Sequence, residues 1–327
     1  MTDVLVLGGT GWLSGRIAEK WADAGASVTC LARGGRDAPY GTTLVVGDRD
    51  EPEAYAAVTG REWDEVVDIS STPSHVAAAV AALGERAKHW TYISTVSVYA
   101  ANDEAGAGES AELLAPAGPD EDEDYGRAKV RAEASVRGAL GHRAAIVRPG
   151  LIVGPGDPTD RFGYWVGRFG LAGDGDVLVP DLDARGTQVI DVDDLSGFVQ
   201  AIGRERWTGV ANAVGDPTDL DDVLRLAREV AGHTGALVTA TDTWLEQHDV
   251  AYWSGPRSLP LWLPREMTGF WTRSNAVYRL LGGRLRPLRD TLERTFRDEQ
   301  ARGLDRPRRA GLARADELAL VREVAAA

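Results

Sequence analysis

The chain has few of the side chains that form disulfides or bind transition metals. One cysteine, Cys30, stands in 327 residues, so no disulfide can form within the chain and no metal site with several thiolate ligands can be built. The five histidines are scattered, without the paired spacing of a zinc site or the Ser/His/Asp pattern of a nucleophilic hydrolase. The sequence therefore implies no metal cofactor.

Acidic residues outnumber basic ones, 50 to 36, and long apolar runs are scarce. A formal net charge of -14 disfavours binding to nucleic acid or to an anionic membrane surface. No run approaches the roughly 18 apolar residues of a membrane-spanning helix, although the hydrophobic fraction of 43% is ordinary for a globular protein. Because Met1 to Val4 lead directly into an apolar strand, we expect no targeting peptide and a cytoplasmic location.

The first motif is a strand, a glycine-rich turn and a helix. Residues 4–7 are an apolar run, residues 8–15 are rich in glycine, and residues 16–24 have helical spacing. Glycine lets the backbone approach a pyrophosphate, and the N–H groups and positive end of the following helix attract its charge. We expect a dinucleotide cradle; the alternative is a plain turn between strand and helix.

The end of the second expected strand, residues 27–31, bears on the choice of cofactor. In dinucleotide folds this strand end contacts the ribose of the adenosine half. The chain places Arg33 and Arg36 there rather than a carboxylate. Because a guanidinium pairs with a phosphate through its planar fork, Arg33 favours NADP(H), while NAD(H) stays open. The alternative is that both arginines are solvated loop charges.

Strands and helices alternate along the first half of the chain. Strand-like runs at residues 43–46, 65–69 and 91–94 are separated by helical stretches, notably residues 74–88. This alternation predicts an α/β fold, a doubly wound parallel sheet of the Rossmann type, with a smaller, mixed C-terminal substrate domain. Ligands of such sheets bind beyond the carboxyl ends of the strands. Four polar residues fall at these ends: Asp48, Ser70, Ser71 and Thr95.

Tyr125 and Lys129 are four residues apart in a stretch of helical character, so their side chains share one helix face. A phenol with a pKa of about 10 is protonated at neutral pH, and a nearby ammonium group favours the phenolate. The pair can therefore exchange a proton with the oxygen of an alcohol or ketone. The acidic run at residues 120–124 is expected to form the charged start of this helix, after Pro119; a substrate-cation site is the alternative.

Six motifs occur in the order seen in one enzyme superfamily. They are Gly8-Gly-Thr-Gly-Trp-Leu13, Gly47-Asp48, Ile93-Ser-Thr-Val-Ser-Val-Tyr99, Tyr125-x-x-x-Lys129, Arg148-Pro-Gly-Leu-Ile-Val-Gly-Pro155 and Val189-Ile-Asp-Val-Asp-Asp-Leu195. With these motifs the chain resembles the extended short-chain dehydrogenases/reductases, in particular a reductase-type member of the NAD-dependent epimerase/dehydratase-like branch. The match covers most of residues 1–215, and the last third matches loosely.

The resemblance implies roles for individual residues. Tyr125 would be the general acid/base, Lys129 would hold the nicotinamide ribose and tune Tyr125, and Thr95 would polarise the substrate oxygen. Ser94 and Ser97 are rivals for the role of Thr95. The residues expected to contact the cofactor are Gly8, Thr10, Gly11, Trp12, Leu13, Arg33, Asp48, Arg49, Ser70, Ser71, Ser94, Lys129, Pro149 and Leu151. Asp48 would lie near the adenine amino group, and relatives often form homodimers through the helices that carry the Tyr and Lys.

Two departures from the family pattern restrict the chemistry. Relatives that eliminate water from nucleotide sugars carry carboxylates directly after the catalytic hydroxyl residue, where this chain has Val96 and Ser97, so a dehydratase is disfavoured. Many nucleotide-sugar epimerases hold the diphosphate with an asparagine at the place of Leu151, which puts a nucleotide-sugar substrate in doubt. Three arginines of the following segment are candidate partners for phosphates instead: Arg161, Arg168 and Arg185.

We expect the dinucleotide-binding domain to comprise residues 1–150 and about 186–214, and a substrate-binding or lid region to comprise residues 151–185 and 215–327. Tryptophans recur every nine residues between Trp244 and Trp271, but the sequences around them differ, so we reject a repeat and expect mostly packed cover.

The sequence thus favours an NADP(H)-dependent oxidoreductase that transfers hydride at a ketone or secondary alcohol of a polar small molecule, with sugar-like substrates among the candidates. Two alternatives stay open. One is a nucleotide-sugar epimerase with a retained NAD(P), and the other is a non-catalytic dinucleotide-binding regulatory protein.

Overall fold

The computed structural model describes residues 2–116 and 124–326. The chain divides into two compact units, each built from several segments. The first unit comprises Met1–Leu151, Val192–Gly215 and Arg273–Arg284, and the second comprises Ile152–Asp191, Asp216–Thr272 and Leu285–Ala327.

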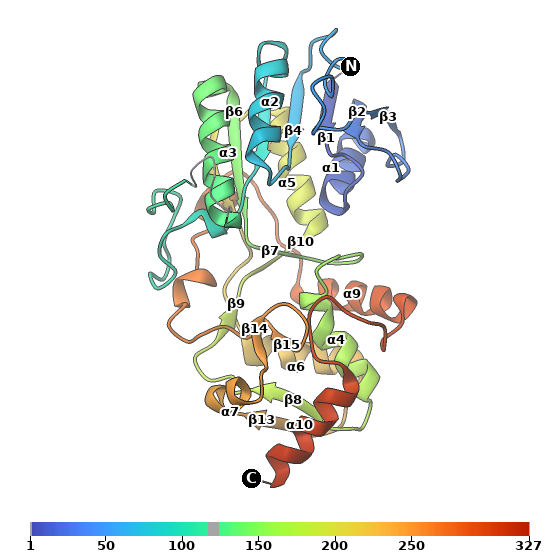
Figure 1. The fold of residues 1–327 in the computed structure, drawn as a ribbon, viewed down its shortest axis with the longest axis vertical. Coiled ribbons are helices and arrows are strands. Elements are labelled where there is room, and N and C mark those ends of the chain that lie inside the picture. The colour runs from blue at the N-terminus through green and yellow to red at the C-terminus, as the bar shows by residue number, and fades with distance from the viewer. Residues whose placement is uncertain (1, 117–123, 327) are drawn as a thin grey trace. The chain divides into compact units, whose positions relative to one another are not determined.

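The first unit is built on a seven-stranded sheet with the order β11-β6-β5-β4-β1-β2-β3, in which every pair of neighbours is parallel (Figure 1). Its strands are β1 (Asp3–Leu7), β2 (Ser27–Ala32), β3 (Thr42–Val46), β4 (Glu65–Asp68), β5 (Trp90–Ile93), β6 (Ala144–Pro149) and β11 (Gly209–Ala213). Strand order reverses between β1 and β4, which is where such sheets bind ligands. The predicted parallel sheet is confirmed.

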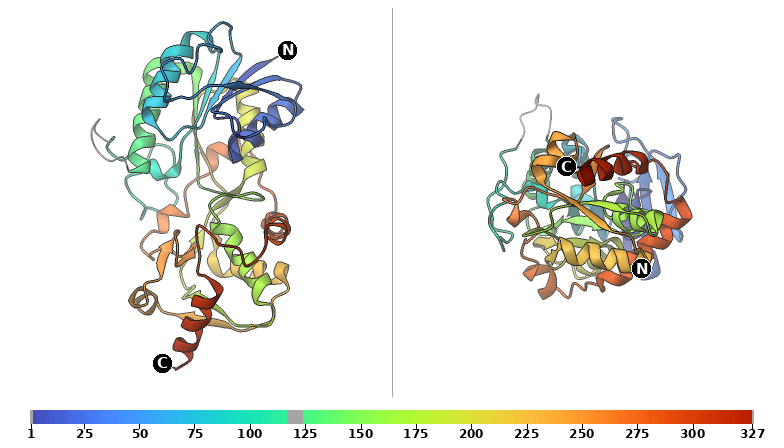
Figure 2. Two further views of the ribbon diagram at one scale, coloured as in Figure 1. Left: turned by 45° about the vertical axis from the view of Figure 1, so that its right-hand side comes forward. Right: turned by 90° about the horizontal axis from the view of Figure 1, so that it is seen from below.

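Helices cover both faces of this sheet, as Figures 1 and 2 show. On one face α1 (Trp12–Asp23) packs against α5 (Val192–Arg204), and on the other α2 (Pro73–Leu83) packs against α3 (Tyr125–Leu140). Apolar residues of α2 and α3 form one core with the strands beneath them; its members include Val66, Val76, Val80, Trp90, Val136 and Leu140. This is the doubly wound arrangement expected from the sequence.

Three short 3-10 helices connect these elements: η1 (Gly84–Arg86), η2 (Val96–Val98) and η3 (Gly141–Arg143). The helix predicted over residues 74–88 ends earlier, because α2 stops at Leu83 and η1 follows. Helix α1 starts at Trp12, ahead of the predicted residue 16, because the glycine turn takes fewer residues than its composition indicated.

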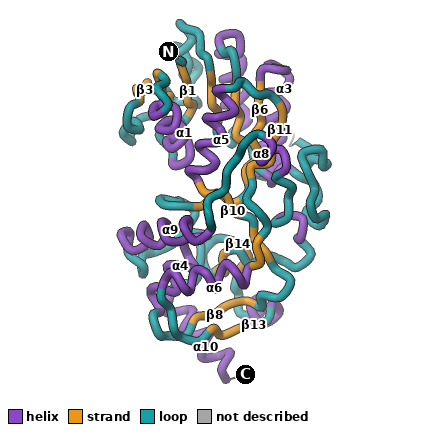
Figure 3. Tube along the Cα trace, turned by 180° about the vertical axis from the view of Figure 1, so that it is seen from behind, coloured by secondary structure: helices purple, strands orange, loops and turns teal. Residues whose placement is uncertain are grey.

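Two segments group differently from the predicted domain boundaries. Residues 273–284 were expected in the substrate region but belong to the first unit, because α8 (Ala276–Leu280) packs beside β11 (Figure 3). The Asn275 side chain also donates to the carbonyl oxygen of Gly215, 3.1 Å away, which ties this segment to the end of the sheet domain. Residues 186–191 were expected in the first unit and belong to the second.

The second unit combines helices with short two-stranded sheets. Its helices are α4 (Arg161–Ala172), α6 (Leu220–Ala231), α7 (Asp242–Gln247), η4 (Thr268–Phe270), α9 (Leu288–Arg302) and α10 (Arg314–Ala326). Its strand pairs are β8 (Val177–Pro180) with β13 (Leu237–Ala240), β9 (Gly186–Thr187) with β12 (Thr218–Asp219), β10 (Val189–Asp191) with β7 (Leu151–Val153), and β14 (Ala251–Trp253) with β15 (Ser258–Pro260). This mixture agrees with the mixed C-terminal part that the sequence predicted.

The tryptophan-rich segment of this unit contributes to packing. Trp262 is fully buried, its Nε1 donates to Asp242, and its ring stacks on Tyr252 at 3.7 Å between centroids. Trp244 stacks on His248 at the same separation.

Candidate functional site

The glycine turn after β1 is closed by a serine hydroxyl. Gly8 has a φ of 79°, a conformation that residues with a Cβ rarely adopt. The Ser14 hydroxyl donates to the carbonyl oxygen of Gly8 at 2.6 Å and accepts from the amide of Gly11 at 3.1 Å. Ser14 stands where dinucleotide-binding turns often have a third glycine. Its hydroxyl bonds to both ends of the turn, and α1 begins at Trp12.

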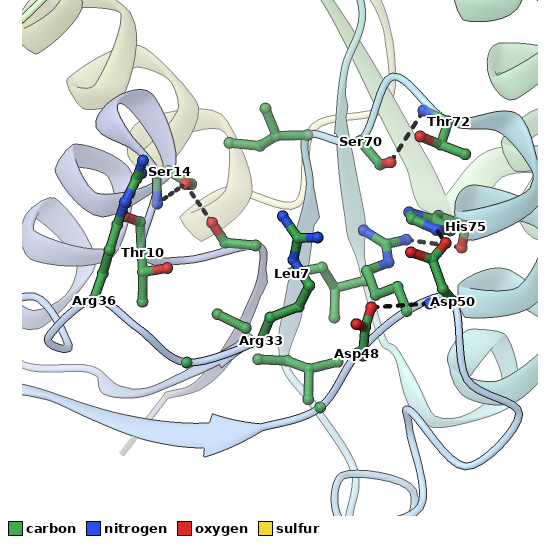
Figure 4. A pocket seen from close by; sticks show the side chains of 18 of the residues that line it. Leu7, Thr10, Ser14, Arg33, Arg36, Asp48, Asp50, Ser70, Thr72 and His75 are labelled. Carbon is green, nitrogen blue, oxygen red and sulfur yellow. Dashed lines mark hydrogen bonds and ion pairs between the residues drawn. The ribbon is translucent and has the colours of Figure 1, made fainter. Parts of the chain in front are cut away.

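A pocket of about 720 Å³ opens beyond the carboxyl ends of β1, β2, β3 and β4, all in the first unit (Figure 4). Its wall comes from the glycine turn and from the loops that follow the other three strands. The lining residues are Leu7, Gly8, Thr10, Gly11, Ser14, Leu31, Ala32, Arg33, Gly34, Gly35, Arg36, Gly47, Asp48, Arg49, Asp50, Ile69, Ser70, Ser71, Thr72 and His75. Its volume falls within the range of about 300 to 1,000 Å³ typical of small-molecule and cofactor sites.

Arg33 and Arg36 supply positive charge to this pocket. Figure 4 shows the Arg33 side chain reaching between the Thr10 side of the pocket and the Asp48 side. Arg33 is exposed and makes no hydrogen bond or ion pair with residues 2–116 or 124–326. The Arg36 guanidinium lies 3.5 Å from the carbonyl oxygen of Thr10. Arg33 is therefore a cation that faces the pocket without a carboxylate partner in the described chain.

The opposite wall carries acidic residues and a histidine. The Asp48 carboxylate accepts from the amide of Asp50 at 3.2 Å, and the Asp50 carboxylate lies 2.6 Å from Nε2 of His75. His75 and Asp50 were not among the predicted site residues, because an isolated histidine on an alanine-rich helix carries no local signal. The structure brings them into the pocket by placing α2 against the loop after β3.

Arg49 lines the same wall, but its guanidinium is engaged within the fold. It forms a bidentate pair with the buried Asp68, both contacts at 2.8 Å, and also donates to Tyr55 and to the carbonyl oxygen of His75. Its charge is therefore neutralised by Asp68 rather than presented to a ligand. Arg49 lines the pocket, and its contact with a cofactor stays a prediction.

Lys129 on α3 is almost fully buried beneath the strand ends. Its Nζ atom donates to the carbonyl oxygens of Ile69, Ser70 and Ile93, at 3.2, 3.0 and 2.6 Å. These contacts use all three hydrogens of an ammonium group. Burial lowers the pKa of Lys129 to about 7, although the Asp68 and Glu133 carboxylates oppose that fall.

Ser70 connects Lys129 to the pocket. Ser70 lines the cavity, and its carbonyl oxygen accepts from both Lys129 and the Tyr92 hydroxyl, at 3.0 and 2.9 Å. Lys129 itself stands behind this residue and is not among the lining residues. The amine therefore lies one residue behind the wall of the pocket.

Tyr125 is the first residue of α3 and is 52% exposed. The Asp124 carboxylate caps the helix by accepting from the amides of Gly126 and Arg127, at 2.9 and 3.2 Å. The helix thus begins at Tyr125, later than the predicted start after Pro119. The rest of the acidic run, residues 120–123, lies outside the described residues.

Thr95 and Ser97 lie next to the start of α3. The Thr95 hydroxyl caps η2 by accepting from the amide of Ser97 at 3.1 Å, and it lies 3.2 Å from the Ser97 hydroxyl. A Cβ atom on Gly126 would overlap the carbonyl oxygen of Ser97. Gly126 therefore allows the helix that carries Tyr125 to approach the segment that carries both hydroxyls.

A buried ion pair anchors α3 to the sheet one turn beyond Lys129. Glu133 receives two hydrogen bonds from Arg148 on β6, at 2.9 and 2.7 Å, and Arg148 also donates to the Tyr99 hydroxyl at 2.9 Å. Arg148 belongs to one of the six sequence motifs, whereas Glu133 was not among the predicted residues. Its position four residues after Lys129, on the same helix face, is the signal that points to it.

The predicted site residues thus fall into two neighbouring groups. The cofactor candidates that line the pocket are Gly8, Thr10, Gly11, Arg33, Asp48, Arg49, Ser70 and Ser71. Trp12 and Leu13 open α1, beside the glycine turn. The candidates outside the lining are Ser94, Thr95, Tyr125, Lys129, Pro149 and Leu151, at the ends of β5 and β6 and on α3 and β7.

Two of the three arginines expected to pair with phosphates in the second unit, Arg168 and Arg185, are engaged in buried contacts. Arg168 pairs with the fully buried Glu317 at 3.2 Å. Arg185 pairs with Asp242 and donates to the carbonyl oxygen of Leu263. Their charges are therefore balanced inside that unit, which contradicts the expectation that Arg168 and Arg185 present free cations to a ligand.

Residues 2–116 and 124–326 contain no group of three or more His, Cys, Asp or Glu side chains placed to hold a metal ion. Within these ranges, every helix is too short or too polar to cross a bilayer.

The fold is similar to the folds of several epimerases of known structure. A Burkholderia cenocepacia J2315 protein provisionally described as an epimerase superposes with a TM-score of 0.72 at 21% identity, over 92% of this chain and 98% of that one. The UDP-N-acetylglucosamine 4-epimerase from Bacillus cereus gives 0.69 at 16% identity, over 95% and 100%. The UDP-glucuronic acid 4-epimerase from Bacillus cereus in complex with NAD gives 0.65 at 14% identity, over 92% and 99%.

This likeness confirms the fold that the sequence motifs implied, across nearly the whole chain. No protein-family model matches the sequence, and a search of curated proteins finds no match.

Proposed function

We propose that the first unit binds NADP(H) and that the chain catalyses hydride transfer at a secondary alcohol or ketone carbon. One observation carries the proposal: a single pocket joins the glycine turn, the cation Arg33 and the Ser70 wall behind which Lys129 lies. Dinucleotides bind at this edge of a doubly wound sheet, where strand order reverses.

The residues of the pocket fit the parts of a phosphorylated dinucleotide. A Cβ on Gly8 would meet no atom within 4 Å, so the turn leaves open space beside the start of α1, where a pyrophosphate is favoured. Arg33 matches a 2′-phosphate through its planar donor fork. Asp48 on the facing wall offers acceptor oxygens to an adenine amino group.

When bound, the dinucleotide supplies or accepts the hydride. Tyr125 gives a proton to, or takes one from, the substrate oxygen, since a phenol is a suitable general acid near neutral pH if a cation favours its ionised form. Lys129 is that cation. Thr95 and Ser97 are neighbouring hydroxyls able to donate to the same substrate oxygen.

The binding part of the proposal is tested by calorimetric titration of the purified protein with NADPH and with NADH. We expect NADPH to bind at least tenfold more tightly, because the 2′-phosphate gains a charge-assisted contact with Arg33. Equal binding of the two nucleotides would remove the NADP(H) preference. Failure of both to bind would remove the proposed function.

A second candidate function is epimerisation with a retained dinucleotide, and the structural neighbours favour it because several are UDP-sugar 4-epimerases. The same residues would then oxidise and reduce the substrate in turn, with no net use of cofactor. Leu151 and the internally paired Arg168 and Arg185 weigh against a UDP-sugar as the substrate. Consumption of free NADPH in the presence of substrate identifies a reductase, and isomerisation without consumption identifies an epimerase.

A further inference from the structure

Two buried carboxylates, Asp68 and Glu133, act on the charge of the Lys129 amine. Asp68 at the end of β4 is paired with Arg49 through two hydrogen bonds of 2.8 Å. Glu133, four residues after Lys129 on α3, is paired with Arg148 on β6 at 2.9 and 2.7 Å. Asp68 and Glu133 are 0% and 1% exposed, so water and salt screen their charges very little.

Neither carboxylate is a direct hydrogen-bond partner of the amine. The three acceptors of the Lys129 Nζ atom are backbone carbonyl oxygens at the ends of β4 and β5. Asp68 is linked to one of them, because its Oδ1 accepts from the Ser70 amide at 3.0 Å while the Ser70 carbonyl oxygen accepts from Lys129. The carboxylates therefore act on the amine through their charge and through the backbone that they position.

The remaining titratable groups near the amine do not supply negative charge at neutral pH. Tyr92 on β5 has its ring 4.8 Å from Nζ, and burial raises the pKa of its hydroxyl. The other charged or titratable residues of α3 are Tyr125, Arg127, Arg131 and Arg137, and those of the neighbouring elements include Arg49, His75 and Arg148. Glu65 on β4 is paired with His89, and Asp50 after β3 is paired with His75. Asp68 and Glu133 are the carboxylates that act on the charge of the Lys129 amine, and Arg49 opposes them.

We propose that Asp68 and Glu133 are positioning residues that keep Lys129 charged and hold its ammonium group against the strand ends. The inference deepens the proposed function and rests on it for its catalytic meaning, since a charged Lys129 is what favours ionisation of Tyr125. Without the two carboxylates, burial would leave the amine neutral at physiological pH. Arg49 and Arg148 neutralise the carboxylates in turn, which explains why all of these groups can be buried together.

The amine can be titrated directly because the chain has only three lysines, Lys20, Lys88 and Lys129. Full-length protein labelled with 13C at the lysine Cε atoms gives three NMR signals. The Lys129 signal is the one that persists in the double variant Lys20→Arg/Lys88→Arg. Its chemical shift is followed from pH 5 to pH 11 without substrate or cofactor, and the other two signals serve as references in the same sample.

We expect Glu133→Gln and Asp68→Asn each to lower the titration midpoint of Lys129 by about one pH unit or more, since a nearby opposite charge is worth one to three units. Glu133→Asp keeps the negative charge and should leave the midpoint within a few tenths of a unit of wild type. An unchanged Lys129 midpoint in both Glu133→Gln and Asp68→Asn overturns the proposal.

A folding defect in Glu133→Gln is foreseeable, because Arg148 would be left buried without its carboxylate. The double variant Glu133→Gln/Arg148→Met removes both charges and should still lower the midpoint, because Glu133 acts on the charge of Lys129 whereas no comparable action comes from Arg148. A midpoint equal to wild type in that variant contradicts the role of Glu133. The titration needs no turnover, so it tests the two proposals separately. A protein with the expected Lys129 midpoints but no affinity for NADPH would contradict the proposed function and leave the roles of Asp68 and Glu133 intact.

Discussion

Gly126 lies against the carbonyl oxygen of Ser97 so closely that a Cβ atom would overlap it. This contact sets the distance between α3, which begins at Tyr125, and η2, which carries Ser97 and follows Thr95. Close packing therefore requires a glycine at position 126, between the Tyr125 and Lys129 of the sequence motif. This close approach brings the start of α3, which carries Tyr125, next to the segment that carries Thr95 and Ser97.

Gly126→Ala should destabilise the protein by about 1 to 3 kcal/mol, because the start of α3 must move away from η2. The measurement is the free energy of unfolding in urea. Gly138→Ala on the same helix is the matched control, since a Cβ there meets no atom within 4 Å. That control should be neutral or stabilising by about 0.5 to 1 kcal/mol, the usual gain from alanine in a helix. Equal effects of the two substitutions would show that the close approach costs nothing.

Tyr125→Phe should reduce the rate of hydride transfer by a factor of about 100 to 10,000, the usual contribution of a general acid or base. Dinucleotide affinity should change little, because Tyr125 is not among the residues that line the pocket. Stopped-flow measurement of NADPH oxidation and calorimetric titration give the two quantities. A Phe variant that turns over like wild type would remove Tyr125 from the mechanism.

Arg33→Gln should weaken NADPH binding by about tenfold to a hundredfold, as expected for the loss of a hydrogen bond to a charged group. NADH has no 2′-phosphate, so its affinity should stay close to that of wild type. Arg61→Gln is a suitable control, because Arg61 pairs with Asp3 away from the pocket. Were NADPH and NADH affinities to fall together, Arg33 would contact a group that both nucleotides share.

His89 and Glu65 form a buried pair that should make stability depend on pH. Burial of the His89 ring works against its protonation, but contacts with Glu65 and the Trp207 carbonyl outweigh it and raise the pKa of His89 above its ordinary value of 6.5. A raised pKa in the folded state means that the protonated pair stabilises fully below about pH 6.5, and that this stabilisation is lost as pH rises through the folded-state pKa.

The His89→Gln variant should therefore lose the most stability in acid. We expect a deficit of about 3 kcal/mol at pH 5.5, the scale of breaking a buried ion pair, and a smaller deficit at pH 9. Urea unfolding at both pH values measures it, with the exposed His142→Gln as control. A deficit that does not change with pH would mean that the pair is not ionised in the folded protein.

Much of the first unit was predictable because its signals are local. The apolar run before Gly8, the glycine turn and the following helical spacing are all contained in about two dozen residues, and β1 and α1 form where these patterns indicated. The spacing of Tyr125 and Lys129 likewise placed both residues on α3. The predicted start of α3, directly after Pro119, was several residues too early. Asp124 caps the helix, but in the sequence it cannot be distinguished from the other acidic residues of the run at 120–124.

The environment of each charged side chain was not predictable in the same way. Arg49 was expected to contact the cofactor, and Arg168 and Arg185 were expected to pair with phosphates. Each of the three meets a carboxylate 19 or more residues away in the sequence. Such pairs form only when the fold brings distant segments together, so the local spacing of residues does not predict them. The pair of His75 and Asp50 in the pocket also joins two segments that are distant in the sequence.

The order of residues by itself determined the strands, the glycine turn, the parallel sheet and the shared helix face of Tyr125 and Lys129, because these depend on short-range periodicity and on backbone chemistry. Tertiary structure alone decided that the Lys129 amine is buried against carbonyl oxygens of Ile69 and Ile93, up to 60 residues away. It also decided that Arg33 faces the pocket while Arg49 is neutralised, since burial and electrostatic pairing depend on which segments meet in space.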